Sequence, residues 1–285
     1  MISLQELLTS VEVGFIFGSV AIGIYLTFRT INFTDLTCDG SFVLGAAASA
    51  ILIKYGIDPY LSLLVSFIAG GIAGLFTGIL NIKFKISDLL SGIIVAFMLY
   101  SINLRVMGNA PNITFIDCTT VFSNSNTITL LIMLIMVPLS LIYLLSSGFG
   151  LKLRAMGYNK QFALTSGINV KLMTVIGLML SNAMISFGGG LFSQYQGFCD
   201  VSQGTGTLVI GLASVVLGER ILLFKKEPLL ILSCIAGSIL YRILIGLALH
   251  SDVFGIGTQD LNLITGAIII LIMLTNKWRK NAYFN

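Results

Sequence analysis

Long apolar runs separated by short polar breaks recur from residue 11 to residue 275. A transmembrane helix needs about 20 mostly apolar residues, so this pattern predicts a helical protein that crosses the membrane several times. We expect about nine hydrophobic segments, at residues 11–28, 42–53, 60–82, 86–104, 128–147, 172–195, 205–218, 228–249 and 260–275. Together they predict one all-α, polytopic membrane domain over residues 1–285.

The composition supports the same class and excludes others. Apolar residues make up 56% of the chain and charged residues only 10%, whereas a soluble domain carries about 25% charged residues. The chain has one histidine, His250, and four isolated cysteines, so we expect no metal site, no cofactor and no catalytic residues. A phosphate-binding loop of the G-x-x-x-x-G-K-[ST] type is absent from the sequence, so any ATP hydrolysis must come from another subunit.

The basic residues predict the orientation of the chain. Net charge is +4, but in a membrane protein the placement of positive charge matters more than its sum, and we expect no nucleic-acid partner. With nine segments and the N-terminus outside, most Lys and Arg residues fall on the side that the positive-inside rule makes cytoplasmic. These residues are Arg29, Lys83, Lys85, Lys152, Arg154, Lys160, Lys171, Arg220, Lys225, Lys226, Lys277, Arg279 and Lys280.

Segments 42–53 and 205–218 are too short for ordinary spanning helices and are rich in Gly, Ala and Ser. The sequences around them, residues 33–47 and 198–213, align with one inserted residue. The identical pairs are Phe33 and Phe198, Asp35 and Asp200, Gly40 and Gly206, Val43 and Val209, Gly45 and Gly211, and Ala47 and Ala213. Short Gly-interrupted segments at matching positions of two halves are typical of broken helices around a transport path.

The alignment predicts two four-segment repeats, residues 11–106 and 173–276, joined by segment five and a cytoplasmic loop at residues 128–172. The repeats start five segments apart, and five is an odd number. The two copies must therefore cross the membrane in opposite directions, as an inverted-topology repeat.

Glycines and polar residues inside the segments each have two interpretations. The ridge of Gly70, Gly74 and Gly78 and the run Gly188–Gly190 favour close helix packing. Carboxylates beside helix starts either cap free N–H groups or line a polar path. We take as candidate path residues Asp35, Asp39, Ser41, Asn182, Gln194, Gln196, Asp200, Thr205 and Arg242.

Arg242 lies within segment 228–249, where an unpaired charge costs at least about 2.5–3.5 kcal/mol near the bilayer centre. It must therefore reach outward or find an acid, and the candidate acids are Asp200, Asp252 and Asp260. A structural ion pair and a contact with a substrate carboxylate or a gate both remain open.

A basic loop at residues 150–171 separates the two halves. It predicts a short amphipathic helix that Gly157 ends, followed by a turn of helix that Asn159 caps from Lys160 and that Gly167 stops. A helical hairpin this short has almost no core of its own. We therefore expect it to need a partner surface.

This loop resembles the coupling loop of permease subunits of ATP-binding-cassette (ABC) importers in the branched-chain amino acid, ribose and simple-sugar class. In that family the loop docks on the ATPase subunit and transmits its closure to the membrane helices. Tyr158 and Lys160 stand where an acidic residue is common in related loops. The coupling residues that the resemblance implies are Arg154, Ala155, Gly157, Asn159, Ala163, Gly167 and Ile168.

Over most of its length the chain is similar to one branch of that class, the tryptophan/tyrosine-type uptake permeases. The motifs are Asp35-Leu36-Thr37-x-Asp39-Gly40-Ser41-Phe42, Leu99-Tyr100-Ser101-x-Asn103-Leu104-Arg105-x-Met107-Gly108 and Gln194-Tyr195-Gln196-Gly197-Phe198-x-Asp200. The resemblance implies two ATPase subunits, a second permease copy (identical or similar) and an extracytoplasmic binding protein, assembled in the bacterial cytoplasmic membrane. It also implies an aromatic or branched amino acid as substrate, with purines or sugars as the alternative.

Two other functions are weighed against the importer. Inverted repeats also build ion-coupled secondary transporters, but these predict acids at the membrane midplane, whereas the acids here lie mostly near segment ends. An intramembrane enzyme would need clusters of His, Cys or acidic residues that the sequence does not contain.

Overall fold

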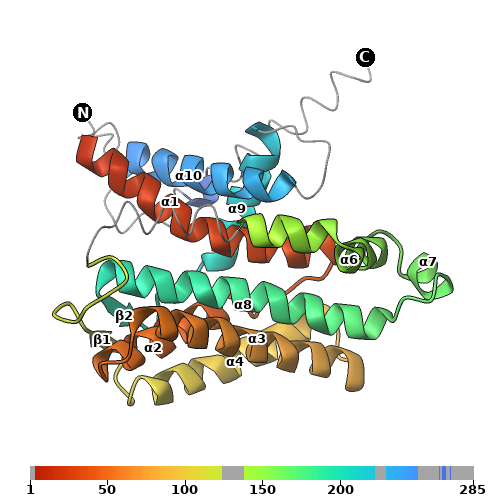
Figure 1. The fold of residues 1–285 in the computed structure, drawn as a ribbon, viewed down its shortest axis with the longest axis horizontal. Coiled ribbons are helices and arrows are strands. Elements are labelled where there is room, and N and C mark those ends of the chain that lie inside the picture. The colour runs from red at the N-terminus through yellow and green to blue at the C-terminus, as the bar shows by residue number, and fades with distance from the viewer. Residues whose placement is uncertain are drawn as a thin grey trace.

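The computed structural model describes residues 4–123, 138–221 and 229–249, together with 263, 265–267 and 270. The described chain is mostly helical, as predicted, and the helices run roughly alongside one another (Figure 1). Helix α1 continues into a π-helical turn, η1 (Leu26–Thr30). The helices are α1 (Leu4–Tyr25), α2 (Cys38–Lys54), α3 (Pro59–Lys83), α4 (Asp88–Val106), α6 (Gly148–Tyr158), α7 (Lys160–Thr165), α8 (Val170–Gln196), α9 (Thr207–Ile221) and α10 (Leu230–Leu249).

Five helical stretches are long and apolar enough to cross a membrane. They are Gln5–Thr30, Pro59–Lys83, Asp88–Val106, Val170–Gln196 and Leu230–Ala248. Each coincides with one of the segments predicted from the sequence. Most of the predicted segments 128–147 and 260–275 lies outside the described residues, so the total of nine stays a prediction.

The bundle has two distinct ends. Helices α6 and α7 lie at one end, the loop end, and the strands β1 (Asn112–Thr114) and β2 (Phe198–Asp200) lie at the other, the strand end (Figure 1). The strands pair antiparallel, with Ile113 opposite Cys199. The sequence did not predict this pairing, which joins two loops that are far apart along the chain.

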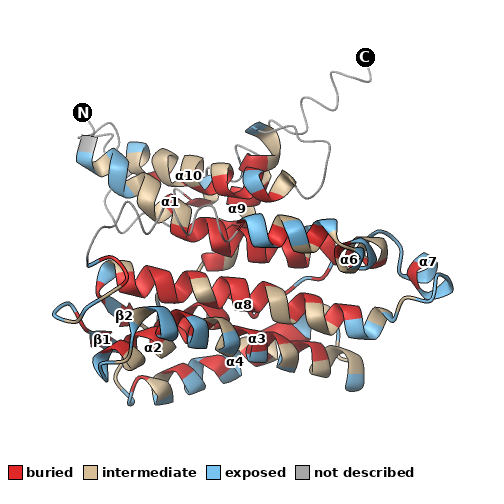
Figure 2. Ribbon diagram, viewed as in Figure 1, coloured by how far each residue is buried: buried red, intermediate tan, exposed pale blue. Residues whose placement is uncertain are grey.

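Helix α8 is the central element, because it is the most buried of the candidate spans (Figure 2). Three consecutive glycines let three other helices approach its backbone. A Cβ on Gly188 would lie 2.5 Å from Ser19 Oγ of α1, one on Gly189 would lie 2.0 Å from Phe42 O of α2, and one on Gly190 would lie 2.9 Å from Ser66 Oγ of α3. A Cβ at Gly189 would press on the backbone of α2, whereas a Cβ at Gly188 or Gly190 would press on side chains of α1 or α3.

The predicted glycine ridge of α3 packs against α8. Cβ atoms would lie 2.3 Å from Asn182 O at Gly70, 2.2 Å from Leu178 O at Gly74 and 3.1 Å from Val175 Cγ2 at Gly78. In lipid, helices associate through such close packing, because burial of apolar surface gives little gain there. The packing interpretation of this ridge is confirmed.

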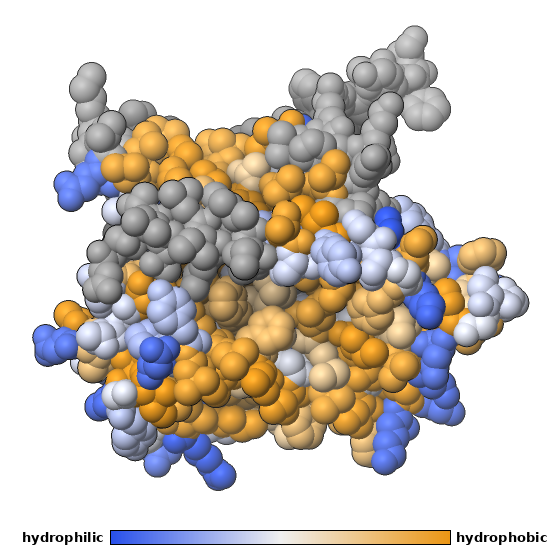
Figure 3. All heavy atoms as spheres, in the orientation of Figure 1, coloured by the Kyte–Doolittle hydropathy of each residue, from blue (hydrophilic) through white to orange (hydrophobic). Residues whose placement is uncertain are grey.

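Helices α1, α9 and α10 form the other half of the bundle (Figure 1). Helix α10 runs antiparallel to α1, with Ser238 Oγ donating a 2.7 Å hydrogen bond to Gly14 O. Gly237 of α10 and Gly218 of α9 approach each other's backbones. On the outside, α3 and α4 present an apolar surface between charged side chains at the two ends (Figure 3), as expected for a lipid-facing surface.

Adjacent glycines of α3 provide a test of this packing. Gly70→Ala would push a Cβ into the carbonyl of Asn182 and should lower the free energy of unfolding by about 1–3 kcal/mol. Gly71→Ala is the matched control, because its nearest atoms lie at an ordinary 3.8 Å, and it should be neutral or stabilising by up to about 1 kcal/mol. Unfolding in mixed detergent micelles measures both, and equal effects would contradict the proposed contact.

Candidate functional site

Helix α2 begins inside the protein, beside the middle of α8. Asp35, just before this helix, is fully buried. Its Oδ1 accepts a 2.8 Å hydrogen bond from Thr37 N, and its Oδ2 accepts a 2.7 Å bond from Asn182 Nδ2 of α8. Ser41 Oγ donates to Asn182 Oδ1 at 2.7 Å. Three of the predicted path residues therefore form one group, the Asp35 cluster (Asp35, Ser41 and Asn182).

The cluster is satisfied internally and fixes the start of α2. Thr37, which lies between its members in sequence, shares a 2.8 Å hydrogen bond with Thr77 of α3. All of these side chains are fully buried. Buried polar groups without partners are costly, so the bonds lock α2 and α3 onto α8 in one arrangement.

Helix α9 begins directly beside the start of α2. Asp39, in the first turn of α2, accepts hydrogen bonds from Leu208 N at 2.9 Å and from Gly206 N at 3.3 Å. Gly204 lies against the backbone of Asp39, where a Cβ would be 2.3 Å from Asp39 O. Asp39 is thus a helix cap, which was one of the two interpretations of the carboxylates beside helix starts. It caps α9 rather than its own helix, α2.

From this meeting point the two helices run to opposite ends of the bundle. The later residues of α2, such as Ala47 and Ile53, pack with Ile113 and Cys199 at the strand end. Glu219, near the end of α9, forms an ion pair with Arg29 at the end of η1. Because α6 also packs against η1, this pair lies at the loop end.

Three further path candidates lie in or beside the segment that leads from the strand end to the start of α9. Asp200 Oδ1 accepts a 2.7 Å bond from Ser202 N, which repeats the turn that Asp35 makes with Thr37. Thr205 Oγ1 donates to Ser202 O at 2.8 Å. Gln196 is hydrogen-bonded to Gln203. These three are not part of the Asp35 cluster.

Gln194 ties α8 to three other segments. Its Nε2 lies 2.9 Å from Ser62 Oγ of α3 and 3.0 Å from Ser49 Oγ of α2. Its Oε1 accepts a 3.0 Å bond from Val121 N in the loop after β1. The side chain is buried, so it connects the strand-end loop to the helices.

The structure places Arg242 against an aromatic ring instead of an acid. Its Cζ lies 4.0 Å from the centre of the Phe17 ring of α1. Within the described residues the ion pair is Arg29–Glu219, and Arg242 is not paired with Asp200. The other predicted acids, Asp252 and Asp260, lie outside the described residues. The ion-pair expectation is therefore not met among the residues the structure describes.

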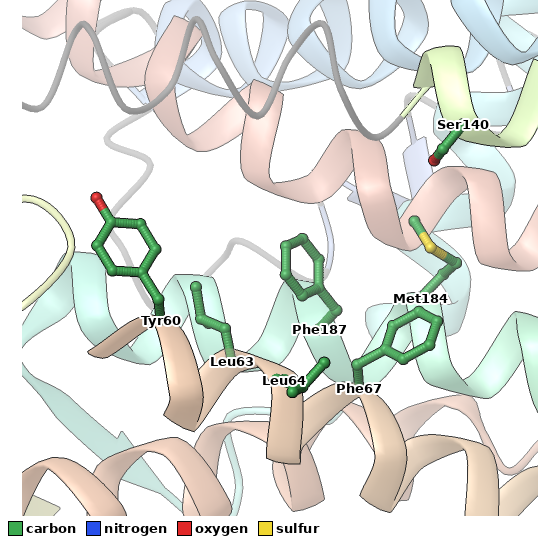
Figure 4. Close-up of a pocket in the computed structure, with 7 residues that line it drawn as sticks. All are labelled: Tyr60, Leu63, Leu64, Phe67, Ser140, Met184 and Phe187. Carbon is green, nitrogen blue, oxygen red and sulfur yellow. The ribbon is translucent and has the colours of Figure 1, made fainter. Parts of the chain in front are cut away.

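An apolar cavity of about 320 Å³ lies between α3, α8 and a helix whose described part covers residues 138–146 (Figure 4). The lining is apolar except for Ser140 and the hydroxyl of Tyr60. The predicted path residues are not among those that line it. Its lining residues are Tyr60, Leu63, Leu64, Phe67, Ser140, Met184 and Phe187.

The loop at residues 150–171 contains the two predicted helices, with one correction. Gly157 was expected to end the first helix, but α6 runs through it to Tyr158. Its role is instead a close contact, because a Cβ there would lie 2.0 Å from Thr30 O. Arg154 contacts the preceding turn and donates to Leu145 O at 3.2 Å. Ala155 lies on α6 between Arg154 and Gly157.

The second helix is capped as predicted. The Asn159 side chain accepts hydrogen bonds from Gln161 N at 2.9 Å and Phe162 N at 3.1 Å and starts α7 at Lys160. Ala163 is fully buried, and its carbonyl accepts from Ile168 N at 3.0 Å. Gly167 ends the turn with φ +76°, a conformation that suits glycine.

The sequence did not identify which apolar side chains of this loop stay exposed. Leu151, Tyr158, Phe162 and Leu164, here called the apolar tip, are all exposed, whereas Leu153 and Met156 of α6 are fully buried. The amphipathic pattern alone does not separate these two groups. The burial of Met156 and Leu153 depends on the point where α6 crosses the bundle, at Gly157. The sequence does not show this point, so the burial could not be predicted.

The described basic residues gather at the loop end, where α1, α3 and α9 end and α8 begins. Lys54 at the end of α2 and Arg105 at the end of α4 lie at the strand end. The basic residues of the loop end are Arg29, Lys83, Lys85, Lys152, Arg154, Lys160, Lys171 and Arg220.

Comparisons with known proteins agree with this geometry. The chain is 40% identical over 264 residues to a tyrosine transport system permease protein of Clostridioides difficile, covering 91% of this chain and 88% of the relative. It is 31% identical over 226 residues to a probable branched-chain amino acid transport permease protein of Methanocaldococcus jannaschii, covering 70% of each. The fold matches a chain of PsaBC from Streptococcus pneumoniae, solved in complex with a Fab, with a TM-score of 0.55, 15% identity and coverage of 94% and 89%.

Residues 7–274 match the family described as branched-chain amino acid transport system / permease component. This match covers nearly the whole chain, including the starts of α2 and α9 and the loop of α6 and α7. The chain belongs to this family and is a multi-pass membrane permease of the ABC transporter type.

Proposed function

We propose that this permease imports an amino acid, with tyrosine as the first candidate, and receives it from an extracytoplasmic binding protein. The observation that carries the substrate proposal is the 40% identity to a tyrosine transport permease over most of both chains. Transport would be driven by two copies of a separate ATPase, acting on a pair of permease subunits. Purines and sugars are the alternative substrates within the same class.

The inverted repeat is part of this proposal. Its support is that α2 and α9 start at one interior point and run to opposite ends. The turns Asp35–Thr37 and Asp200–Ser202, which the alignment pairs, have the same hydrogen bond. We infer nine segments, with repeats at residues 11–106 and 173–276, related by an axis in the membrane plane.

Packing around the two broken helices supports the same symmetry. The aligned glycines Gly45 and Gly211 contact the first long helix of the opposite repeat: Gly45 of α2 lies against Ser186 of α8, and Gly211 of α9 lies against Ile24 of α1. Likewise α3 packs on α8, and α10 packs on α1. A common packing scheme of this kind is expected for duplicated inverted halves.

We place the loop end in the cytoplasm. Its concentration of Lys and Arg residues supports this orientation through the positive-inside rule. The N-terminus, where α1 starts at the strand end, would then lie outside. This side would meet the binding protein, and β1, β2 and their loops would form part of the surface it contacts.

The apolar tip would dock on the ATPase. Three properties of the tip support this role: it is exposed, it is apolar, and it lies in a region that resembles a coupling loop. Arg154, Gly157 and Asn159 would act by holding α6 and α7 in place, since each contacts the chain's own backbone.

A short route connects this tip to the candidate path. Gly157 of α6 contacts Thr30, the last residue of η1, and Ile31, which follows it. The next residues lead to Asp35 and the start of α2. We propose that movement of α6 and α7 shifts this segment and thereby the meeting point of α2 and α9, with Asp39 keeping the two helix starts together.

Inverted repeats also occur in ion-coupled secondary transporters, which work without an ATPase. Such a transporter gives no role to the exposed apolar tip, and the family match favours the importer.

The coupling role is tested with Phe162, which is 62% exposed on α7. Phe162→Asp should reduce recovery of the ATPase with the detergent-solubilised permease at least tenfold, because a charge replaces an apolar docking residue. Quantitative co-purification measures this. Tyr55→Asp is the matched control, since Tyr55 is 78% exposed at the strand end, and it should leave recovery unchanged. ATPase recovery that survives Phe162→Asp would contradict docking through the tip.

The role of Asp39 is tested through helix α9. Asp39→Ala removes its cap and should lower the free energy of unfolding by about 1–2 kcal/mol. The amides of Gly206 and Leu208 should also exchange hydrogen faster, because they lose their acceptors. Asp117→Ala, in an exposed loop, is the control and should change stability by less than about 0.5 kcal/mol. Unchanged exchange at the start of α9 would refute the cap.

A further inference from the structure

Arg242 is a cation in the interior of a membrane-spanning helix without an acidic partner among the described residues. It lies in the span Leu230–Ala248. Its Nε is buried and has no hydrogen-bond partner within the described part of the chain. Glu12, an acid of the neighbouring α1, is bonded to Tyr195 Oη at 2.8 Å. Ionisable residues inside membrane helices are rare and mark substrate or ion pathways.

The guanidinium group lies level with the middle of the α1 span rather than with either of its ends. It sits over the ring of Phe17, which is the midpoint of the α1 span Gln5–Thr30. Helix α10 begins at the loop end, and side chains lean toward the N-terminus of their helix. Arg242 therefore points away from the strand end, although that end is nearer along α10. This direction is opposite to the outward reach of a side chain that seeks lipid phosphates.

The ring beneath Arg242 is held in place by two other helices. Phe17 packs against Phe42 of α2, with ring centres 5.6 Å apart, and against Phe192 of α8, 5.1 Å away and edge-on. On the other side, Tyr241 Oη donates to Thr265 Oγ1 at 2.9 Å and fixes the rotation of α10. The cation thus lies on a ring that is held in place by packing, next to the broken helix α2.

Stacking on the ring leaves the hydrogen-bonding edge of the guanidinium unused. A cation over an aromatic face interacts through its charge, whereas the five N–H donors of arginine lie in the guanidinium plane. Their planar fork matches the two oxygens of a carboxylate. Arg242 also remains partly exposed.

We propose that Arg242 binds the carboxylate of the transported amino acid at the midplane of the membrane. The proposal rests on the proposed function, because an amino acid supplies the anion. It is carried by three observations: the cation has no acidic partner among the described residues, it points inward, and it lies on an aromatic ring. Arg242 is then retained for transport at a cost in stability, since the empty site leaves a cation unpaired in the bundle.

The experiment uses the complete complex of permease, ATPase and binding protein in liposomes, with radiolabelled tyrosine as the probe. Arg242→Gln should lower ATP-driven uptake at least tenfold. It should leave the ATP hydrolysis that the binding protein stimulates within twofold of wild type, because the coupling loop is untouched. The melting temperature of the solubilised complex should be unchanged or higher, because a buried unpaired cation is removed. Arg242→Lys should give intermediate uptake, because it keeps the charge but loses the fork.

Arg105→Gln is the control, because it removes an arginine at the strand end of α4, and it should keep uptake within twofold. Wild-type uptake by Arg242→Gln would overturn the proposal. The proposal would also be overturned if Arg242→Gln and Phe17→Leu both lowered the melting temperature, because the cation would then have a structural role. Loss of subunits from the Arg242→Gln complex would assign the carboxylate to a partner chain. If the wild-type complex moves no amino acid, the proposed function itself fails, and the Arg242 proposal fails with it.

Discussion

The structure depends on backbones that touch around helix α8. Gly188, Gly189 and Gly190 bring α1, α2 and α3 into contact with one turn of this helix. In lipid, burial of apolar side chains gains little, so contact between backbones and hydrogen bonds across helices must hold the bundle together. The next turn of α8 brings Phe192 and Gln194 close to α2. The Asp35 cluster and Gln194 are therefore positioned from α8.

The second constraint is the meeting of two helix starts inside the protein. Helix N-termini carry partial positive charge and free N–H groups, and α2 and α9 bring two of them to one place. Asp39 supplies the acceptor for α9, while Asp35 closes the turn before α2 and binds Asn182. Each of the two helix starts thus has a carboxylate beside it that accepts hydrogen bonds from backbone N–H groups. A small shift of either helix would break these hydrogen bonds and leave buried polar groups without partners, which is costly.

Much of this fold could be predicted from the sequence. The spans of α3, α4, α8 and α10 follow from apolar length, and the Asn159 cap follows from local hydrogen-bonding chemistry. Features that depend on long-range contacts could not be predicted. Gly157 looks like a helix breaker in isolation, and only the crossing with Thr30 explains it. The β1–β2 pair joins two three-residue strands from distant loops, too short to leave a pattern. For Arg242 the sequence left a structural ion pair and a substrate or gate contact open, because it does not show that Phe17 lies beneath the guanidinium.

The central claim is that this permease works with an ATPase and not on its own. The most direct measurement is uptake of tyrosine into liposomes that contain either the permease alone or the permease with its ATPase and binding protein. The account predicts uptake only for the complete complex, only with ATP on the side of the loop end, and none from a proton or sodium gradient alone. Gradient-driven uptake by the permease alone would contradict it and assign the protein to the secondary transporters.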